Sequence, residues 1–136
     1  MKLLRPLLLL LTLCLAASSP APLRLRAGKD FALFFAVRDY QHWQRLPGTV
    51  SDANRLATEL QNQYGFEAKV YENKTRTEIL SIIGEYKRRT YEADAQLLVF
   101  FGGHGYYDGQ CTGYFVPRDG LPNDPDGTSY LSFADL

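Results

Sequence analysis

The segment Gln96–Gly105, with the sequence QLLVFFGGHG, decides the fold that we expect for this chain. Its apolar run Leu97–Phe101 has the length and the residue types of a strand that is buried on both faces. Glycines then lie on both sides of His104. Open α/β sheets bind their ligands beyond the carboxyl ends of the strands. A histidine in a glycine-rich turn at that point is therefore a candidate functional residue.

Two interpretations of His104 follow from this position. An imidazole can act as a general acid or base near neutral pH, and the glycines beside it let a reacting group approach the backbone closely. Alternatively, His104 is only a polar residue in a glycine-rich turn. A motif built on a single histidine does not decide between the two.

Two more apolar runs precede this segment. Phe31–Val37 is continuously apolar, which predicts a central strand covered on both faces, and Phe66–Tyr71 predicts a shorter second strand. The first and third strands are the most apolar, so we expect them to be neighbours near the centre of the sheet. Their carboxyl ends carry Arg38-Asp39-Tyr40 and His104, which should open into one crevice.

Helical patterns separate these strands. Apolar residues recur at helical spacing over residues 52–64, and Gly65 supplies a left-handed stop. Thr75 followed by Glu78 is a capping box, which predicts the start of a second helix. The order β-α-β-α-β leaves room only for parallel crossovers. It therefore predicts an α/β fold with a three-layer, doubly wound, mainly parallel sheet.

The chain changes character after His104. We expect a turn over residues 106–109, a brief strand at Tyr114–Val116 and an irregular loop at Pro117–Thr128. Ser132 then has the pattern of a helix start, four residues before the end of the given sequence. We therefore expect the sheet to be incomplete at its C-terminal side and the chain to be the N-terminal part of a larger domain.

The N-terminus has the pattern of a signal peptide. Lys2 and Arg5 precede the apolar stretch Leu7–Ala17, and small residues follow that suit cleavage after residue 18. Residues 1–18 are therefore interpreted as a signal peptide, with an uncleaved anchor as the alternative, and residues 19–29 as a linker. Export to the periplasm or out of the cell is the expected localisation.

Composition narrows the classes of partner. Removal of Lys2 and Arg5 with the signal leaves 13 basic residues against 15 acidic ones, so charge gives no reason to expect nucleic acid or an anionic membrane as partner. Cys111 is then the only cysteine, which excludes an internal disulfide, and no metal-ligand spacing is present. We expect no metal and no cofactor. The sequence does not indicate an oligomeric state.

Five segments, in order and spacing, resemble the caspase-like cysteine peptidases, particularly their bacterial caspase-domain and metacaspase branch. The segments are FALFFAV (31–37), SDANRLATEL (51–60), YGFEAKVYEN (64–73), LLVFFGGHG (97–105) and GYFVPRD (113–119). The resemblance covers residues 30–136, and it implies a cysteine endopeptidase that acts on a peptide or protein substrate through a Cys-His dyad. The resemblance leaves open whether calcium activates the enzyme.

The resemblance also assigns roles to single residues. His104 matches the catalytic histidine, and the amide of Gly105 matches an oxyanion-hole donor. Asp52 lies where metacaspase-like members carry the acid of a pocket for Arg or Lys at the cleaved position (P1). Its alternative role is an acid that stabilises the first turn of a helix. Arg38 or Arg45 could instead form a basic pocket for Asp substrates, although no motif favours them.

The sequence departs from the family at the nucleophile. The family carries its cysteine well beyond the histidine, whereas Cys111 lies only seven residues after His104 and does not match that position. We therefore expect the nucleophile to lie outside this chain. The alternatives are an inactive caspase-fold binding module or a gene remnant. An unrelated doubly wound domain of the receiver or flavodoxin type and a serine hydrolase are disfavoured, because no phosphate-binding glycine motif and no G-x-S-x-G elbow occur.

Overall fold

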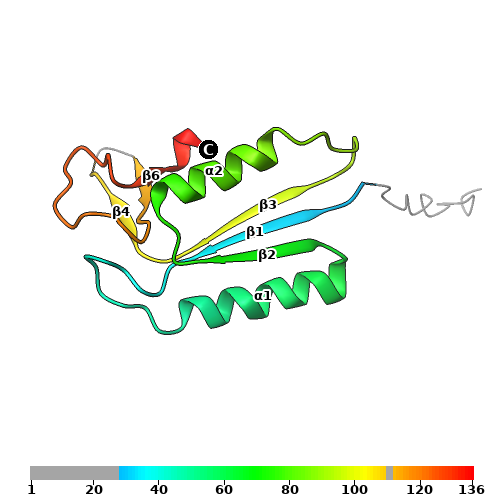
Figure 1. Cartoon of the computed structure of the whole chain (residues 1–136), viewed down its shortest axis with the longest axis horizontal. Coiled ribbons are helices and arrows are strands. Elements are labelled where there is room, and N and C mark those ends of the chain that lie inside the picture. The colour runs from blue at the N-terminus through cyan, green and yellow to red at the C-terminus, as the bar shows by residue number, and fades with distance from the viewer. Residues whose placement is uncertain (1–27, 110–111) are drawn as a thin grey trace, which may run out of the picture.

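A computed structural model describes residues 28–109 and 112–136 of the chain (Figure 1). The expected signal peptide over residues 1–18, nearly all of the expected linker over 19–29, and Cys111 lie outside the described residues. None of the helices that the structure describes is long and apolar enough to cross a bilayer.

The three apolar runs form one parallel sheet. Its strands are β1 (Phe31–Ala36), β2 (Glu67–Glu72) and β3 (Leu97–Gly102), in the order β2-β1-β3. The prediction that the first and third strands are neighbours is confirmed, and β1 is the central strand. The prediction that β3 is fully buried is wrong, because Leu97 and Leu98 remain 37% and 38% exposed. Within the described residues, β3 pairs with β1 on one side only.

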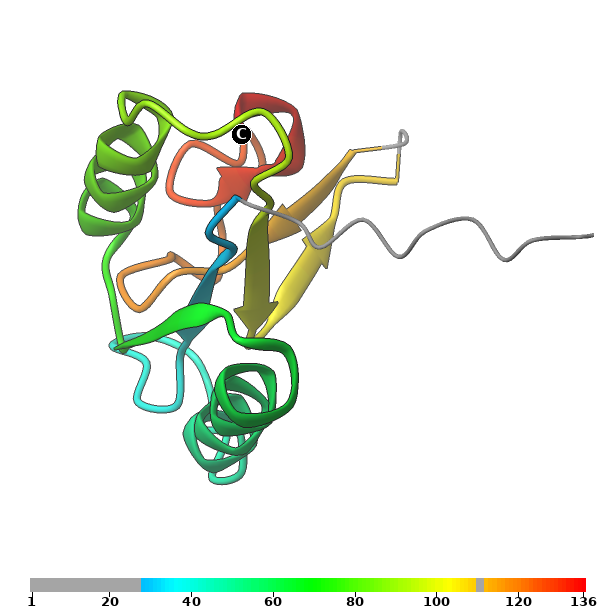
Figure 2. The same cartoon turned by 90° about the vertical axis from the view of Figure 1, so that its right-hand side faces the viewer.

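Two helices cover the two faces of this sheet, as Figures 1 and 2 show. The helix α1 (Thr49–Tyr64) packs on one face, and α2 (Arg76–Lys87) packs on the other. Alternate residues of β1 point to opposite faces, as in any strand. Those at even positions meet α1 and those at odd positions meet α2; the odd ones are Leu33, Phe35 and, just after the strand, Val37. The expected three-layer α/β fold with a parallel sheet is confirmed.

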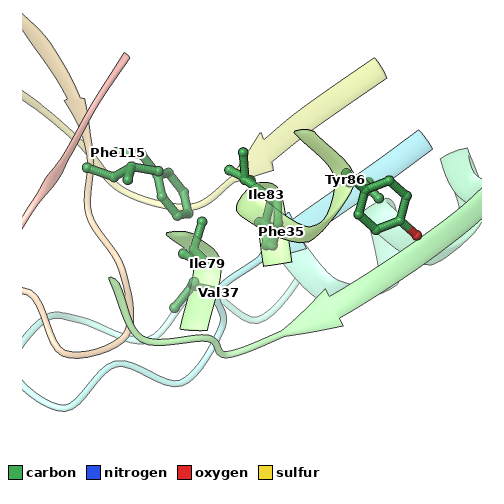
Figure 3. Packing of buried hydrophobic residues seen from close by; sticks show 8 residues of the cluster. Phe35, Val37, Ile79, Ile83, Tyr86 and Phe115 are labelled. Atoms are coloured by element: carbon green, nitrogen blue, oxygen red, sulfur yellow. The ribbon is translucent and has the colours of Figure 1, made fainter. Parts of the chain in front are cut away.

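The face of the sheet under α2 carries the larger core. Phe35 and Val37 pack against Ile79 and Ile83, and all four side chains are almost fully buried (Figure 3). Phe115 joins this cluster from the C-terminal part of the chain. The C-terminal segment is therefore anchored on the same core as α2.

The helix ends agree with the sequence at α2 and differ at α1. The backbone N–H of Glu78 donates to Thr75 Oγ1 at 3.3 Å, and the N–H of Thr75 donates to Glu78 Oε2 at 2.9 Å, so the capping box is confirmed. The helix α1 begins at Thr49, three residues before the expected start. Its cap residue, Gly48, has no side chain to cap with, so the sequence carries no signal for this start.

A small antiparallel sheet follows the parallel one. Its strands are β4 (Gly105–Tyr107), β5 (Gly113–Phe115) and β6 (Leu131–Ser132), in the order β4-β5-β6. Only β5 matches an expected strand: β4 occupies part of the turn that we expected over residues 106–109, and β6 spans only two residues. The expected helix start at Ser132 is a short 3-10 helix, η1 (Phe133–Asp135), whose Ala134 N–H donates to Ser132 Oγ at 3.1 Å.

Candidate functional site

The carboxyl ends of β1 and β3 meet, and the loops that follow them contact each other. The N–H of Val37 donates to the carbonyl of Gly102 at 2.9 Å, which extends the pairing of the two strands by one step. Beyond it, the backbone N–H of His104 donates to the hydroxyl of Tyr40 at 2.7 Å. The two loops that we expected to share a crevice are therefore joined by a hydrogen bond.

Tyr40 fixes the backbone at His104. The Tyr40 and His104 rings lie 4.8 Å apart between centroids, and burial raises the pKa of the Tyr40 phenol, so it stays protonated at neutral pH. Gly103 makes this approach feasible. A Cβ at position 103 would overlap the Tyr40 hydroxyl and would come within 2.9 Å of the Phe115 ring. A side chain at position 103 would therefore separate the two loops.

The imidazole of His104 is oriented by the loop that follows β1. Its Nε2 lies 2.8 Å from the carbonyl oxygen of Gln44, and the Trp43 ring lies 5.3 Å from the imidazole between centroids. A carbonyl oxygen only accepts hydrogen bonds, so this contact requires the proton on Nε2. Nδ1 of the neutral ring then carries the lone pair. Sequence reasoning missed Gln44, because a main-chain carbonyl belongs to every residue type.

The amide of Gly105 points away from the strand beside it. Gly105 is opposite Phe115 in the β4-β5 ladder, and the flanking bond runs from Val116 N–H to the His104 carbonyl at 2.9 Å. Flanking bonds mark a non-hydrogen-bonded pair, in which both residues turn their own N–H outward. The N–H of His104 is already used by Tyr40, so Gly105 supplies the next amide that can donate to a ligand.

A cavity of about 350 Å³ lies between the end of β3 and the start of α1. Its lining residues are Leu46, Pro47, Gly48, Thr49, Asp52, Phe100 and Gly102. Asp52 is the single ionisable residue among them, in the first turn of α1. The cavity therefore combines apolar walls with one carboxylate. Gly102, which lines the cavity, lies two residues before His104 in the chain.

Arg38 and Arg45 lie outside this cavity lining and bind the same acid. Arg45 Nε donates to Asp39 Oδ1 at 2.7 Å, and Arg38 Nε donates to Asp39 Oδ2 at 2.9 Å. Hydrogen bonds from Arg45 and then from Arg38 lower the pKa of Asp39, so its carboxylate stays ionised. Both arginines therefore pair with Asp39 through Nε and lie outside the lining of the cavity.

Within residues 28–109 and 112–136, no group of three or more His, Cys, Asp or Glu side chains is arranged to hold a metal ion. The features gathered at the end of β3 are therefore an oriented imidazole, an outward amide and an acidic cavity.

A comparison with models of protein families identifies the family of the chain. The family model for the caspase domain matches residues 29–132, which is most of the chain and all of the strands and helices described above except η1. No curated protein matched the chain in a sequence comparison. The family implies protein substrates. On this match, the chain belongs to the caspase-domain family.

Proposed function

We propose that this chain supplies the histidine, one oxyanion donor and the P1 pocket of an exported cysteine endopeptidase of the metacaspase type. One observation carries the proposal: the Gln44 carbonyl fixes the imidazole of His104 beside the outward amide of Gly105. Besides a nucleophile, acyl transfer needs a general base and an oxyanion donor, and here they lie on adjacent residues. The nucleophile is a cysteine that we expect outside this chain.

The proposed reaction begins with proton transfer from the cysteine thiol to Nδ1 of His104. The thiolate attacks the peptide carbonyl, a C–S bond forms, and the carbonyl oxygen becomes an oxyanion that accepts a hydrogen bond from Gly105 N–H. Nδ1 then returns its proton to the leaving amine as the C–N bond breaks. In the second half, His104 takes a proton from water, which attacks the thioester and releases the thiolate.

Substrate choice in this proposal rests on the cavity of about 350 Å³. Apolar walls such as Phe100 and Leu46 suit the methylene stem of a long side chain, and the Asp52 carboxylate suits the cation at its tip. This combination supports Arg or Lys at P1. Asp52 also keeps its helix-stabilising role in the first turn of α1, so the two roles are compatible.

The experiment begins with the coding frame beyond Leu136. We expect the frame to continue through a helix and an apolar strand into a cysteine-bearing, glycine-rich turn. The protein from that whole frame should cleave a peptide after Arg or Lys. In it, His104→Ala should lower kcat on the order of 10⁶-fold, as removal of the base does in a serine peptidase.

His42 provides the matched control, because it is the only other histidine of the given sequence and lies exposed in the loop after β1. We expect His42→Ala to keep full activity. A frame without such a cysteine, or equal turnover by the His104→Ala and His42→Ala enzymes, contradicts the proposed function.

A further inference from the structure

The two carboxylate oxygens of Asp52 face different surroundings. Oδ1 lies 3.3 Å from Nη2 of Arg55, which follows three residues later on α1. Oδ2 faces the cavity wall at Gly48, where it lies 3.5 Å from the position that a Cβ would take. One oxygen of the acid is therefore already paired within the chain, and the other lies beside Gly48, which also lines the cavity.

We propose that Arg55 competes with the substrate cation for Asp52 and thereby sets the balance between arginine and lysine at P1. This inference rests on the proposed function. Arg55 carries the same guanidinium group as an arginine substrate, and its side chain is 82% exposed, so it can leave Asp52 without disturbing the core. Arg55 pairs with the Asp52 carboxylate whenever no substrate is in the pocket.

The competition affects the two substrates differently because their cations differ in shape. A guanidinium is planar and binds a carboxylate best through both oxygens at once. An ammonium is a compact charge that one oxygen satisfies. With Arg55 on Oδ1, a lysine can still use Oδ2, whereas an arginine must displace Arg55 to gain its second hydrogen bond. Arg55 therefore penalises arginine more than lysine.

The size of the effect follows from the exposure of the pair. Solvent-exposed ion pairs are weak, since water screens both charges and the side chains lose freedom. Removal of Arg55 should therefore tighten arginine binding only about two- to five-fold. The other nearby guanidinium groups, of Arg38 and Arg45, bind Asp39 and lie outside the cavity lining, so they are not competitors for Asp52.

The test measures binding and needs no nucleophile. N-acetyl-arginine amide and N-acetyl-lysine amide are titrated against the 136-residue chain, and dissociation constants are obtained by ligand-observed NMR at micromolar protein. We expect Arg55→Gln to lower the dissociation constant of N-acetyl-arginine amide about two- to five-fold, and that of N-acetyl-lysine amide by less. Asp52→Asn should weaken both ligands.

Lys87→Gln is the matched control, because it removes one positive charge at the far end of the other helix, α2. We expect it to leave both constants unchanged. If Arg55→Gln behaves like Lys87→Gln, or changes arginine and lysine binding by the same factor, the inference about Arg55 is wrong while the Asp52 pocket stands. If Asp52→Asn binds both ligands as well as the natural chain does, the pocket of the proposed function is wrong, and the inference falls with it.

Discussion

The contact between Gly103 and Tyr40 decides where the His104 backbone lies. Gly103→Ala places a methyl group against the Tyr40 hydroxyl and the Phe115 ring, so one of them must move. We expect a loss of about 1–3 kcal/mol in the free energy of unfolding, as for other overpacked sites. Urea denaturation measures it. Gly105→Ala is the control, because its nearest neighbour is the Tyr114 carbonyl at an ordinary 3.7 Å; equal stability of the two variants would contradict this account.

At the residue scale, the sequence singles out candidate side chains and gives no signal for main-chain groups. His104 is a candidate because it follows an apolar strand in a glycine-rich turn, and Asp52 because the resemblance marks its position. Gln44 acts through its carbonyl, which has no sequence signature. Tyr40 was expected near the crevice, but nothing in the sequence said that its hydroxyl accepts from a backbone amide 64 residues away.

At the scale of elements, the capping box of α2 carries a pH dependence. Hydrogen bonds from the Thr75 backbone and then from Lys74 and the Thr75 hydroxyl lower the pKa of Glu78 from 4.5 to about 2. A carboxyl whose pKa is lowered by folding stabilises the folded state above its unfolded pKa. This contribution should therefore be complete above pH 4.5 and should be lost as the pH falls toward about 2.

Glu78→Gln should remove that dependence. We expect the variant to be less stable than the natural chain at neutral pH and to lose less stability between pH 4.5 and about 2. Urea unfolding at several pH values in this window measures the difference. Glu85→Gln on the same helix, outside the capping box, is the control. Parallel stability curves for Glu78→Gln and the natural chain would contradict the prediction.

Elements with side-chain signals were predictable, and those without were missed. Thr75 and Glu78 predict the start of α2, because their side chains make the hydrogen bonds of the capping box. The start of α1 at Thr49 was missed, because Gly48 caps it without a side chain. The strand β4 lies where the sequence over residues 106–109 predicts a turn, and β6 spans only two residues, which is too short for an alternating pattern to be recognised.

At the scale of the whole molecule, β3 is an edge strand of the sheet that leaves apolar side chains exposed. Among the described residues it has no paired strand, and Leu97 and Leu98 are each more than a third exposed. Unpaired apolar edges template pairing with other chains. We therefore expect the 136-residue chain to self-associate as its concentration rises, and sedimentation velocity measures this.

Leu98→Lys should suppress the association, because a charge on an edge strand disfavours pairing. Leu56→Lys is the matched control: Leu56 is exposed to a similar degree, 45%, but lies on α1. Equal suppression by both variants would mean that general charge rather than the β3 edge is responsible.

The fold class itself followed from the alternation of strands and helices. The open edge of β3 agrees with the expectation of a sheet that is incomplete at its C-terminal side. The exposure of Leu97 and Leu98 was not predicted, because an apolar run indicates buried faces and carries no information about edges.

The turn after β2 limits how this protein can be handled in a eukaryotic secretory host. Asn73 has a left-handed φ of 50°, and its Oδ1 accepts the N–H groups of Arg38 and Asp39 at 2.8 and 2.9 Å. Asn73-Lys74-Thr75 is also an N-glycosylation sequon. Replacing Asn73 to remove the sequon would also remove both hydrogen bonds to the loop that follows β1. Thr75→Asp removes the sequon without creating another and keeps a good helix cap, so it is the replacement of choice for production in such a host.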